Sequence, residues 1–376
     1  MRFLLYTHSL VSDWNHGNAH FLRGVMRELI ARGHDAIALE PEHGWSRRHL
    51  VAQNGSVATE RFERDFPTLR TQVYDEDFDH EAALAVADVV IVHEWIEPEL
   101  VARIGRARRE GGAFTLFFHD THHRAVTATS DIADLMLQDY DGILAFGETL
   151  RQRYVDAGWG PRAFTWHEAA DDRLFRPLPE VEKTGDLVWI GNWGDEERSA
   201  EIGAFLIEPA RRLCIDGTVY GVRYPDQALI ALDEAGLRYR GWIANADVPH
   251  AFAGHRVTIH VPRRPYLDSL RGIPTIRVFE ALACGIPLIS APWDDAENLF
   301  RPGKDFLFAQ DSDEMTGLLA QVLNDADRAA ELAASGLEII RTRHTCRHRV
   351  DELFSILAAC GTARVLDQLI PMEAAQ

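Results

Sequence analysis

The sequence contains very little lysine: only Lys183 and Lys304 are lysines among its 39 basic residues, and the others are arginines. It has no Gly-Lys-Ser/Thr pair of the kind that holds phosphates in P-loop kinases and ATPases. Basic residues are also outnumbered by 58 acidic ones, which gives a formal net charge of −19. Because a field of that sign repels phosphate backbones and anionic lipid, we expect no general binding to nucleic acid or to membrane surfaces.

Cysteine is equally scarce, and long apolar runs are missing. The four cysteines lie far apart and form no C-x-x-C pair, so the pattern does not call for an oxidising compartment. No stretch approaches the roughly 18 apolar residues of a membrane span, and the apolar run at the N-terminus is too short for a signal peptide. We therefore expect a cytoplasmic protein with no integral membrane segment.

The length and the alternation of the chain predict two α/β domains. A single core stops growing at about 250–300 residues, whereas this chain has 376. Short apolar runs typical of buried parallel strands alternate with segments of helical periodicity, and the alternation restarts after a polar stretch near residue 180. We expect two Rossmann-like, doubly wound domains that face a cleft. Their predicted limits are residues 1–180 and 181–355, with a helical tail at 356–376 that can return to the first domain.

The segment 271–289 carries the most specific signal. Pro274 and Gly285 are placed as expected for the start and the end of a helix. The free N–H groups at such a helix start can bind an anion. Glu280, one to two turns further along, can accept both hydroxyls of a ribose. The alternative is a half-buried helix in which Glu280 pairs with Arg277 or Arg301 for purely structural reasons.

This segment resembles the signature of GT-B-fold glycosyltransferases of the group 1 (family 4) type. The matching run is Phe279-Glu280-Ala281-Leu282-Ala283-Cys284-Gly285-Ile286-Pro287. Weaker similarities lie at Leu29–Asp35, Asp88–Trp95 and Asp171–Pro177. The runs Trp14–His20 and Pro274–Glu280 are most similar to the spore-maturation (CgeB-like) branch.

The resemblance implies transfer of a sugar from a nucleotide-diphosphate donor to an acceptor hydroxyl, with no metal or other cofactor. The acceptor would be a glycan, a glycoconjugate or a small molecule. Retention of configuration is the habit of the family. The chain departs from the family at Gly272, where a glutamate usually contacts the donor sugar, and it lacks the usual Arg and Lys after the first strand of the second domain.

The resemblance and the chemistry together nominate site residues. For the nucleotide these are Glu280, Trp242, Ile243, Thr275 and Ile276. For the diphosphate we expect guanidinium groups and the helix start, namely Arg263, Arg277, Arg198, Gly272 and Ile273. The loop with His16, Gly17 and Asn18 is expected to approach the donor or the acceptor.

Histidine marks the expected reacting centre in the first domain. His119 ends a predicted strand and is the candidate catalytic residue, with Asp120 to orient it. Three alternatives stay open. One is a metal-dependent hydrolase built on His16, His20, His119 and His122. Another is a nucleotide-sugar epimerase or hydrolase on the same fold. The third is a non-catalytic binding protein, which would keep Glu280 but show no turnover.

Overall fold

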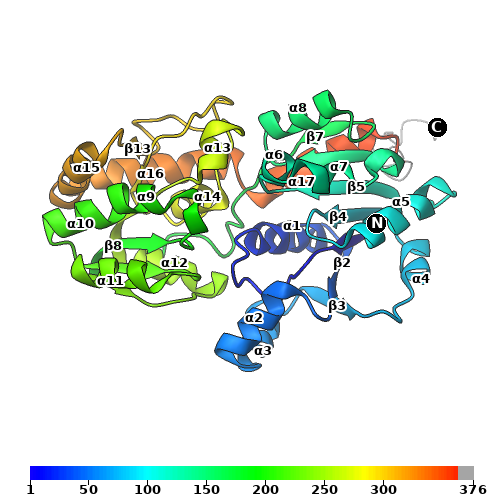
Figure 1. Ribbon diagram of the computed structural model, residues 1–376, viewed down its shortest axis with the longest axis horizontal. Coiled ribbons are helices and arrows are strands. Elements are labelled where there is room, and N and C mark those ends of the chain that lie inside the picture. The colour runs from blue at the N-terminus through cyan, green and yellow to red at the C-terminus, as the bar shows by residue number, and fades with distance from the viewer. Residues whose placement is uncertain (363–376) are drawn as a thin grey trace, which may run out of the picture. The chain divides into compact units, whose positions relative to one another are not determined.

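A computed structural model describes residues 1–362, which form two compact units. The first unit comprises residues 1–12, 22–167 and 346–362. The second comprises residues 13–21 and 168–345. Figure 1 shows that each unit is a sheet covered by helices. The two-domain α/β fold expected from the sequence is thus confirmed.

The first unit is built on a seven-stranded, fully parallel sheet with strand order β3-β2-β1-β4-β5-β6-β7. Its strands are β1 (Arg2–Tyr6), β2 (Asp35–Pro41), β3 (Arg70–Tyr74), β4 (Val89–His93), β5 (Thr115–Asp120), β6 (Gly142–Ala145) and β7 (Ala163–Thr165). Strands β4 to β6 are buried along their whole length. They are near-continuous apolar runs because helices cover both faces of the sheet.

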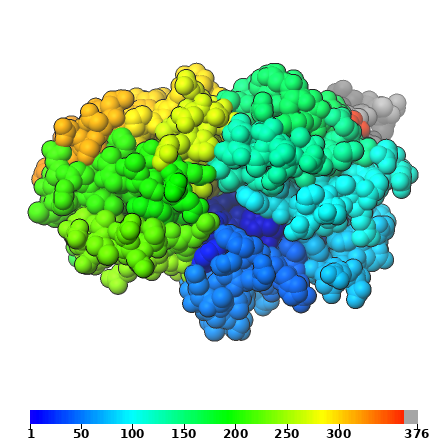
Figure 2. All heavy atoms as spheres, in the orientation of Figure 1, coloured from blue at the N-terminus to red at the C-terminus, as the bar shows by residue number. Residues whose placement is uncertain are grey.

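The helices of the first unit connect these strands. They are α1 (Ala19–Ala31), α2 (Trp45–Asn54), α3 (Val57–Asp65), α4 (His80–Ala85), α5 (Pro98–Arg109), α6 (Arg124–Thr127), α7 (Thr129–Ala133), the 3₁₀ turn η1 (Leu137–Asp139), α8 (Glu148–Ala157) and α17 (Cys346–Ala359). Helices α2 and α3 lie on the surface (Figure 2), where Trp45 and Val57 are exposed. The first three residues of α1 count with the second unit.

The second unit repeats this topology with six parallel strands in the order β10-β9-β8-β11-β12-β13. The strands are β8 (Gly185–Ile190), β9 (Gly217–Tyr220), β10 (Leu237–Tyr239), β11 (His255–His260), β12 (Leu288–Ser290) and β13 (Leu307–Phe308). The helices are η2 (Asp195–Glu197), α9 (Ser199–Ile202), η3 (Gly203–Ile207), α10 (Glu208–Leu213), α11 (Asp226–Glu234), η4 (Asn245–Asp247), α12 (Val248–Ala253), α13 (Arg264–Asp268), α14 (Ile276–Ala283), α15 (Ser312–Asn324) and α16 (Ala326–Arg343).

The limits of the units differ from the sequence-based ones. The first unit ends at His167 rather than at residue 180, and it regains the chain at Cys346, where α17 begins. Helix α17 packs on the first unit: Phe354 contacts Phe3, and the backbone carbonyl of Arg349 accepts a bond from the Trp166 indole at 2.8 Å. Most of the predicted tail, residues 363–376, lies outside the described residues.

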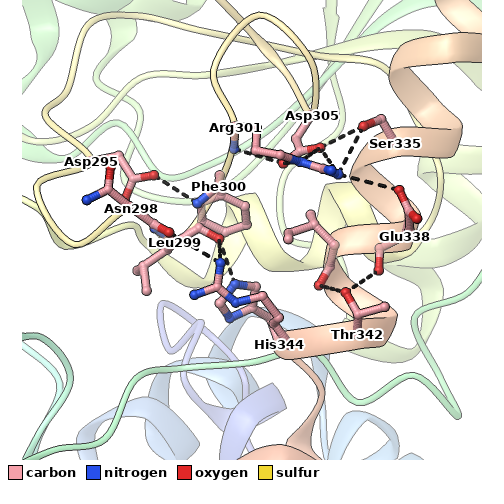
Figure 3. Close-up of polar contacts among 12 residues, drawn as sticks. Asp295, Asn298, Leu299, Phe300, Arg301, Asp305, Ser335, Glu338, Thr342 and His344 are labelled. Atoms are coloured by element: carbon pink, nitrogen blue, oxygen red, sulfur yellow. Dashed lines mark hydrogen bonds and ion pairs between the residues drawn. The ribbon is translucent and has the colours of Figure 1, made fainter.

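A buried carboxylate ties the loop after β12 to α16 in the second unit (Figure 3). Asp305 is fully buried and accepts bonds from the backbone N–H of Arg301 at 2.8 Å and from its guanidinium at 2.8 Å. The Ser335 hydroxyl of α16 donates to the same carboxylate at 2.7 Å. Arg301 therefore pairs with Asp305. The sequence had also allowed a pair between Arg301 and Glu280, and the structure does not form it.

Removing this carboxylate should destabilise the second unit. For Asp305→Ala we expect a loss of about 2 kcal/mol, because the Arg301 backbone N–H, the half-exposed Arg301 guanidinium and the Ser335 hydroxyl lose their acceptor. Urea unfolding measures the loss as a lower midpoint. Asp313→Ala breaks an exposed pair with Arg212 on the same unit and should cost less than about 1 kcal/mol. Equal midpoint shifts in the two variants would contradict this reading of the loop.

Candidate functional site

The polar groups of the second unit gather where its strand order reverses. Strands β8 and β11 are neighbours there, and in open parallel sheets ligands bind outside the carboxyl ends of such a pair. Asn192 follows β8, and Arg263 follows β11. Helix α14 starts beside them, since the Thr275 hydroxyl lies 3.1 Å from the Nε2 atom of His260, the last residue of β11. This edge is therefore the natural place for a ligand.

Three arginines share this edge. Arg198 donates to the backbone carbonyls of Val261 at 2.9 Å and of Asn192, and its guanidinium lies over the Trp189 ring. Burial, together with the charges of Arg263 and Arg277, lowers the pKa of Arg198 to about 9. Arg198, Arg263 and Arg277, which the sequence predicts as diphosphate ligands, therefore lie close enough to interact electrostatically. Arg263 also pairs with Glu197 at 2.9 Å. The mutual repulsion of the guanidinium groups favours an anion at this edge.

The start of α14 is shaped by a chain of neutral side chains. The Ser290 hydroxyl donates to the carbonyl of Ala291 at 2.7 Å and so accepts the Nδ1–H of His260 at 2.9 Å. Burial lowers the pKa of His260 to about 3, so its Nε2 is an acceptor for the Thr275 hydroxyl. Thr275 stands at the N-cap without a side-chain bond to the helix. The hydroxyl is thereby drawn away from the N–H groups of the first turn.

Glu280 is fully buried in α14 and has a partner on each carboxylate oxygen. Arg277 pairs with Oε2, and the Nδ1 atom of His20 lies 2.8 Å from Oε1. The sequence allowed this pair with Arg277 as a purely structural role for Glu280, the alternative to binding a ribose. Each carboxylate oxygen can accept more than one hydrogen bond, so Glu280 keeps capacity for further donors such as hydroxyls.

A second buried carboxyl, Glu168, faces the same helix start. It accepts the backbone N–H of Ile276. Burial, together with the charge of the neighbouring Glu280, raises the pKa of Glu168 to about 8. At pH 7 the group therefore carries a proton. A neutral acid at the positive end of a helix leaves the dipole uncompensated, which again favours an anionic ligand there.

The segment Asp13–Phe21 packs with the second unit, which sequence reasoning missed. Asp13 accepts the Trp242 indole N–H at 3.1 Å and the Asn245 backbone N–H at 3.1 Å. The side chain of Asn192 donates to Asn15. A Cβ atom on Gly17 would come 3.1 Å from the Ile276 side chain, so this loop lies against the first residue of α14. His16 and Asn18 are buried in the same loop.

Gly272 has a structural reason to be glycine. Its φ angle is +94°, and a Cβ atom would lie 3.2 Å from that of Ala296. Both features disfavour any larger residue. The glutamate that the resembling family carries here would therefore be strained in this loop. Ile273, beside it, is buried.

In the first unit, polar residues line the carboxyl ends of β4 and β5. His119 is fully buried and packs its ring against Trp166 and His93, with centroids 4.9 and 5.4 Å apart. Burial lowers the pKa of His119 to about 3, so the imidazole is neutral at pH 7. Next to it, burial raises the pKa of Glu94 well above its usual range, with a further contribution from Asp120.

The expectation that Asp120 orients His119 is wrong. The Asp120 carboxylate accepts the Tyr154 hydroxyl at 2.7 Å and the His122 backbone N–H at 2.9 Å. Neighbouring residues of a strand point to opposite faces of the sheet, so these two side chains diverge. Asp120 instead fixes the turn that follows β5.

The histidines do not assemble into a metal site. Within residues 1–362, no three His, Cys, Asp or Glu side chains are grouped so that they could hold a metal ion. His20 binds Glu280 in the second unit, whereas His119 and His122 belong to the first. The metal-dependent hydrolase considered from the sequence therefore gains no support. Over the same residues, no helix is long and apolar enough to cross a membrane.

Comparison with known proteins assigns the fold. Residues 198–355 match a family described as glycosyl transferase-like. HepE of Anabaena in complex with UDP-glucose has a TM-score of 0.67 at 13% identity, over 96% of this chain and 100% of that one. Sucrose-phosphate synthase of Thermosynechococcus elongatus has a TM-score of 0.64 at 12% identity, over 96% and 100%. An α-glucosyltransferase in complex with UDP has a TM-score of 0.68 at 10% identity, over 95% and 100%.

No curated protein sequence matches the chain. The fold is that of the GT-B class, with two doubly wound units of the same topology. The segment that matches the glycosyl transferase-like family, residues 198–355, includes Glu280 and the three arginines.

The proton on Glu168 should make stability fall with rising pH. The folded state holds this proton up to pH 8, whereas an unfolded glutamate releases it near 4.5, so stability falls between these values by up to about 1.4 kcal/mol per pH unit. Glu168→Gln imitates the protonated acid, so the stability of this variant should decrease less as the pH rises. Melting temperatures from pH 5 to 9 measure it.

The control is Glu180→Gln, on an exposed residue of the same segment, which should keep the wild-type profile. If the stability difference between Glu168→Gln and wild type did not change with pH, Glu168 would not carry the proton.

Proposed function

We propose that the protein transfers a sugar from a nucleoside-diphosphate sugar to an acceptor hydroxyl, with the donor bound at the β8–β11 edge of the second unit. The observation that carries the proposal is the arrangement at the start of α14. Three guanidinium groups and a helix N-terminus lie next to the buried carboxylate Glu280. Guanidinium groups and the free N–H groups of a helix N-terminus bind phosphate oxygens, and a carboxylate accepts hydrogen bonds from ribose hydroxyls.

In this arrangement the diphosphate is bound by Arg198, Arg263 and Arg277, together with the backbone of Gly272 and Ile273. Glu280 accepts the ribose hydroxyls, and Thr275 and Ile276 border the ligand. Trp242 and the backbone of Ile243 are the proposed partners of the base. Uracil is the first candidate base, because HepE and the α-glucosyltransferase were solved with UDP or UDP-glucose.

The arginines take over the charge neutralisation that a divalent cation would provide, so we propose a metal-independent reaction. Retention of configuration is the proposed outcome. His119 is the proposed contact to the transferred sugar or the acceptor. Its lowered pKa favours a neutral hydrogen-bonding role over proton transfer, because so weak a base rarely takes a proton at pH 7. A glycan or glycoconjugate acceptor, a cytoplasmic location and a place in the CgeB-like branch stay proposals, the last supported by the runs Trp14–His20 and Pro274–Glu280.

UDP should stabilise the wild-type protein, and the phosphate-binding arginines should account for much of the effect. At about 100 times its dissociation constant a ligand adds about 2.7 kcal/mol, which raises the melting temperature by several degrees. Arg263→Gln should lower the affinity for UDP about tenfold or more but leave that for uridine unchanged. Calorimetric titration measures both.

Arg211→Gln is the matched control, because Arg211 is an exposed arginine on α10. It should bind UDP like the wild type. If GDP, TDP or ADP raised the melting temperature in place of UDP, the base would be reassigned. If no nucleoside diphosphate raised it, the donor site would be refuted.

His119 should affect turnover without affecting nucleotide binding. For His119→Ala we expect a fall of about a hundredfold in the release of UDP from UDP-glucose, because a hydrogen bond to the reacting sugar is lost, with UDP affinity within twofold of wild type. Coupled detection of UDP gives the rate. Unchanged release would remove His119 from the reacting centre, and His119→Asn should recover part of the rate.

A further inference from the structure

One interaction of the second unit joins parts of the chain that lie 260 residues apart. His20 and Glu280 are 1% and 0% exposed at their side chains, and the His20 Nδ1 atom lies 2.8 Å from the Oε1 atom of Glu280. On the other side of the ring, the backbone N–H of Asp171 donates to His20 Nε2 at 2.8 Å. Three separate segments of the unit therefore meet at this imidazole.

These two bonds determine the tautomer of His20. A backbone N–H can only donate, so Nε2 must be the acceptor and carries no proton. The proton of the neutral ring then lies on Nδ1, which donates it to Glu280. This is the tautomer that a carboxylate requires of its partner. It is set by the Asp171 backbone, independently of Glu280.

The plane of the ring is fixed as well. His20 stacks on Phe175, with centroids 3.9 Å apart and an angle of 16° between the rings. Rotation about the last side-chain bond would break the stack and both hydrogen bonds. The donated proton is thus held at one position and points at one oxygen of Glu280.

We propose that His20 is a positioning residue for the donor: it orients the Glu280 carboxylate so that the carboxylate can accept the ribose hydroxyls. Arg277 alone leaves Oε1 without a directed partner, and a carboxylate held at one oxygen can rotate. With both oxygens held, the remaining lone pairs have fixed directions. The inference rests on the proposed function, because it assigns His20 a role only if Glu280 binds ribose.

Discrimination between ribose and deoxyribose reports the orientation of Glu280. A hydroxyl bonded to a charged acceptor is worth about tenfold or more in affinity, so we expect wild type to prefer UDP over 2′-deoxy-UDP by at least that factor. His20→Phe keeps the ring stacked on Phe175 but cannot donate to Glu280. It should lower the preference to below about threefold, while the phosphates still bind. Calorimetric titration of both nucleotides gives the ratios.

Rescue distinguishes orientation from simple structural support. The side-chain amide of asparagine can donate from near the position of Nδ1, so His20→Asn should keep most of the ribose preference, although it loses the stack. His20→Gln resembles the Nε2 side of the ring and should not. The inference would be overturned if the ribose preference of the variants followed the size of the side chain or the melting temperature, with His20→Asn no better than His20→Gln.

The failures of the two proposals are separable. If wild type bound no nucleoside diphosphate, the donor site itself would fail. If wild type showed the ribose preference, Glu280→Gln abolished it and His20→Phe retained it, the donor site would stand and the role of His20 would be overturned. A wild-type ratio near one would refute the ribose role of Glu280 and this inference with it.

Nitrogen-15 spectra of the histidine rings test the tautomer directly. We expect one neutral ring with its proton on Nδ1 whose signals vanish in His20→Phe and shift in Glu280→Gln. Signals of the Nε2–H form for His20 would contradict the assignment.

Discussion

A carboxylate buried in an apolar helix is the constraint on which the second unit depends. Glu280 is fully enclosed in α14, and an uncompensated charge there would cost several kcal/mol. The unit meets this demand with Arg277 one helical turn away and with His20 from a distant segment. His20 is in turn held by Asp171 and Phe175, so three stretches of chain are committed to one side chain. A carboxylate used only for stability would be replaced at less cost by an apolar residue.

The repeated topology explains why the chemistry gathers at the strand ends. In both sheets the strand order reverses next to the first strand of the unit, and the residues that leave β8 and β11 diverge there. The diverging loops carry Arg198 and Arg263, and the following helix presents Thr275 and Arg277. In the first unit the same edge carries His119 and Glu94. The sheet thus determines where reactive groups can stand, and the loops determine which groups they are.

Local patterns made much of this predictable. The buried strands, the helix bounded by Pro274 and Gly285, and the pairing of Glu280 with Arg277 all arise within a few residues, so periodicity and spacing reveal them. Short edge strands are harder to predict: β3, for example, is mostly exposed and carries little apolar signal. The contact of His20 with Glu280 could not be read, because nothing local links residues 260 apart. The divergence of His119 and Asp120, by contrast, follows from strand alternation and was available from the sequence.

The charge of the whole chain gives the arginine cluster its meaning. A protein with a net charge of −19 has acidic partners in abundance, and exposed arginines such as Arg103, Arg211 and Arg238 are paired with them. Arg198 instead donates to backbone carbonyls and has its pKa lowered by burial and by two other guanidinium groups. Arg263 pairs with Glu197 at 2.9 Å and Arg277 pairs with Glu280, whereas Arg198 is held by neutral carbonyl groups, so the burial of its charge opposes folding. The arrangement is understandable if the compensating negative charge comes from a ligand, and two phosphates at the start of α14 supply charge of the required sign at the required place.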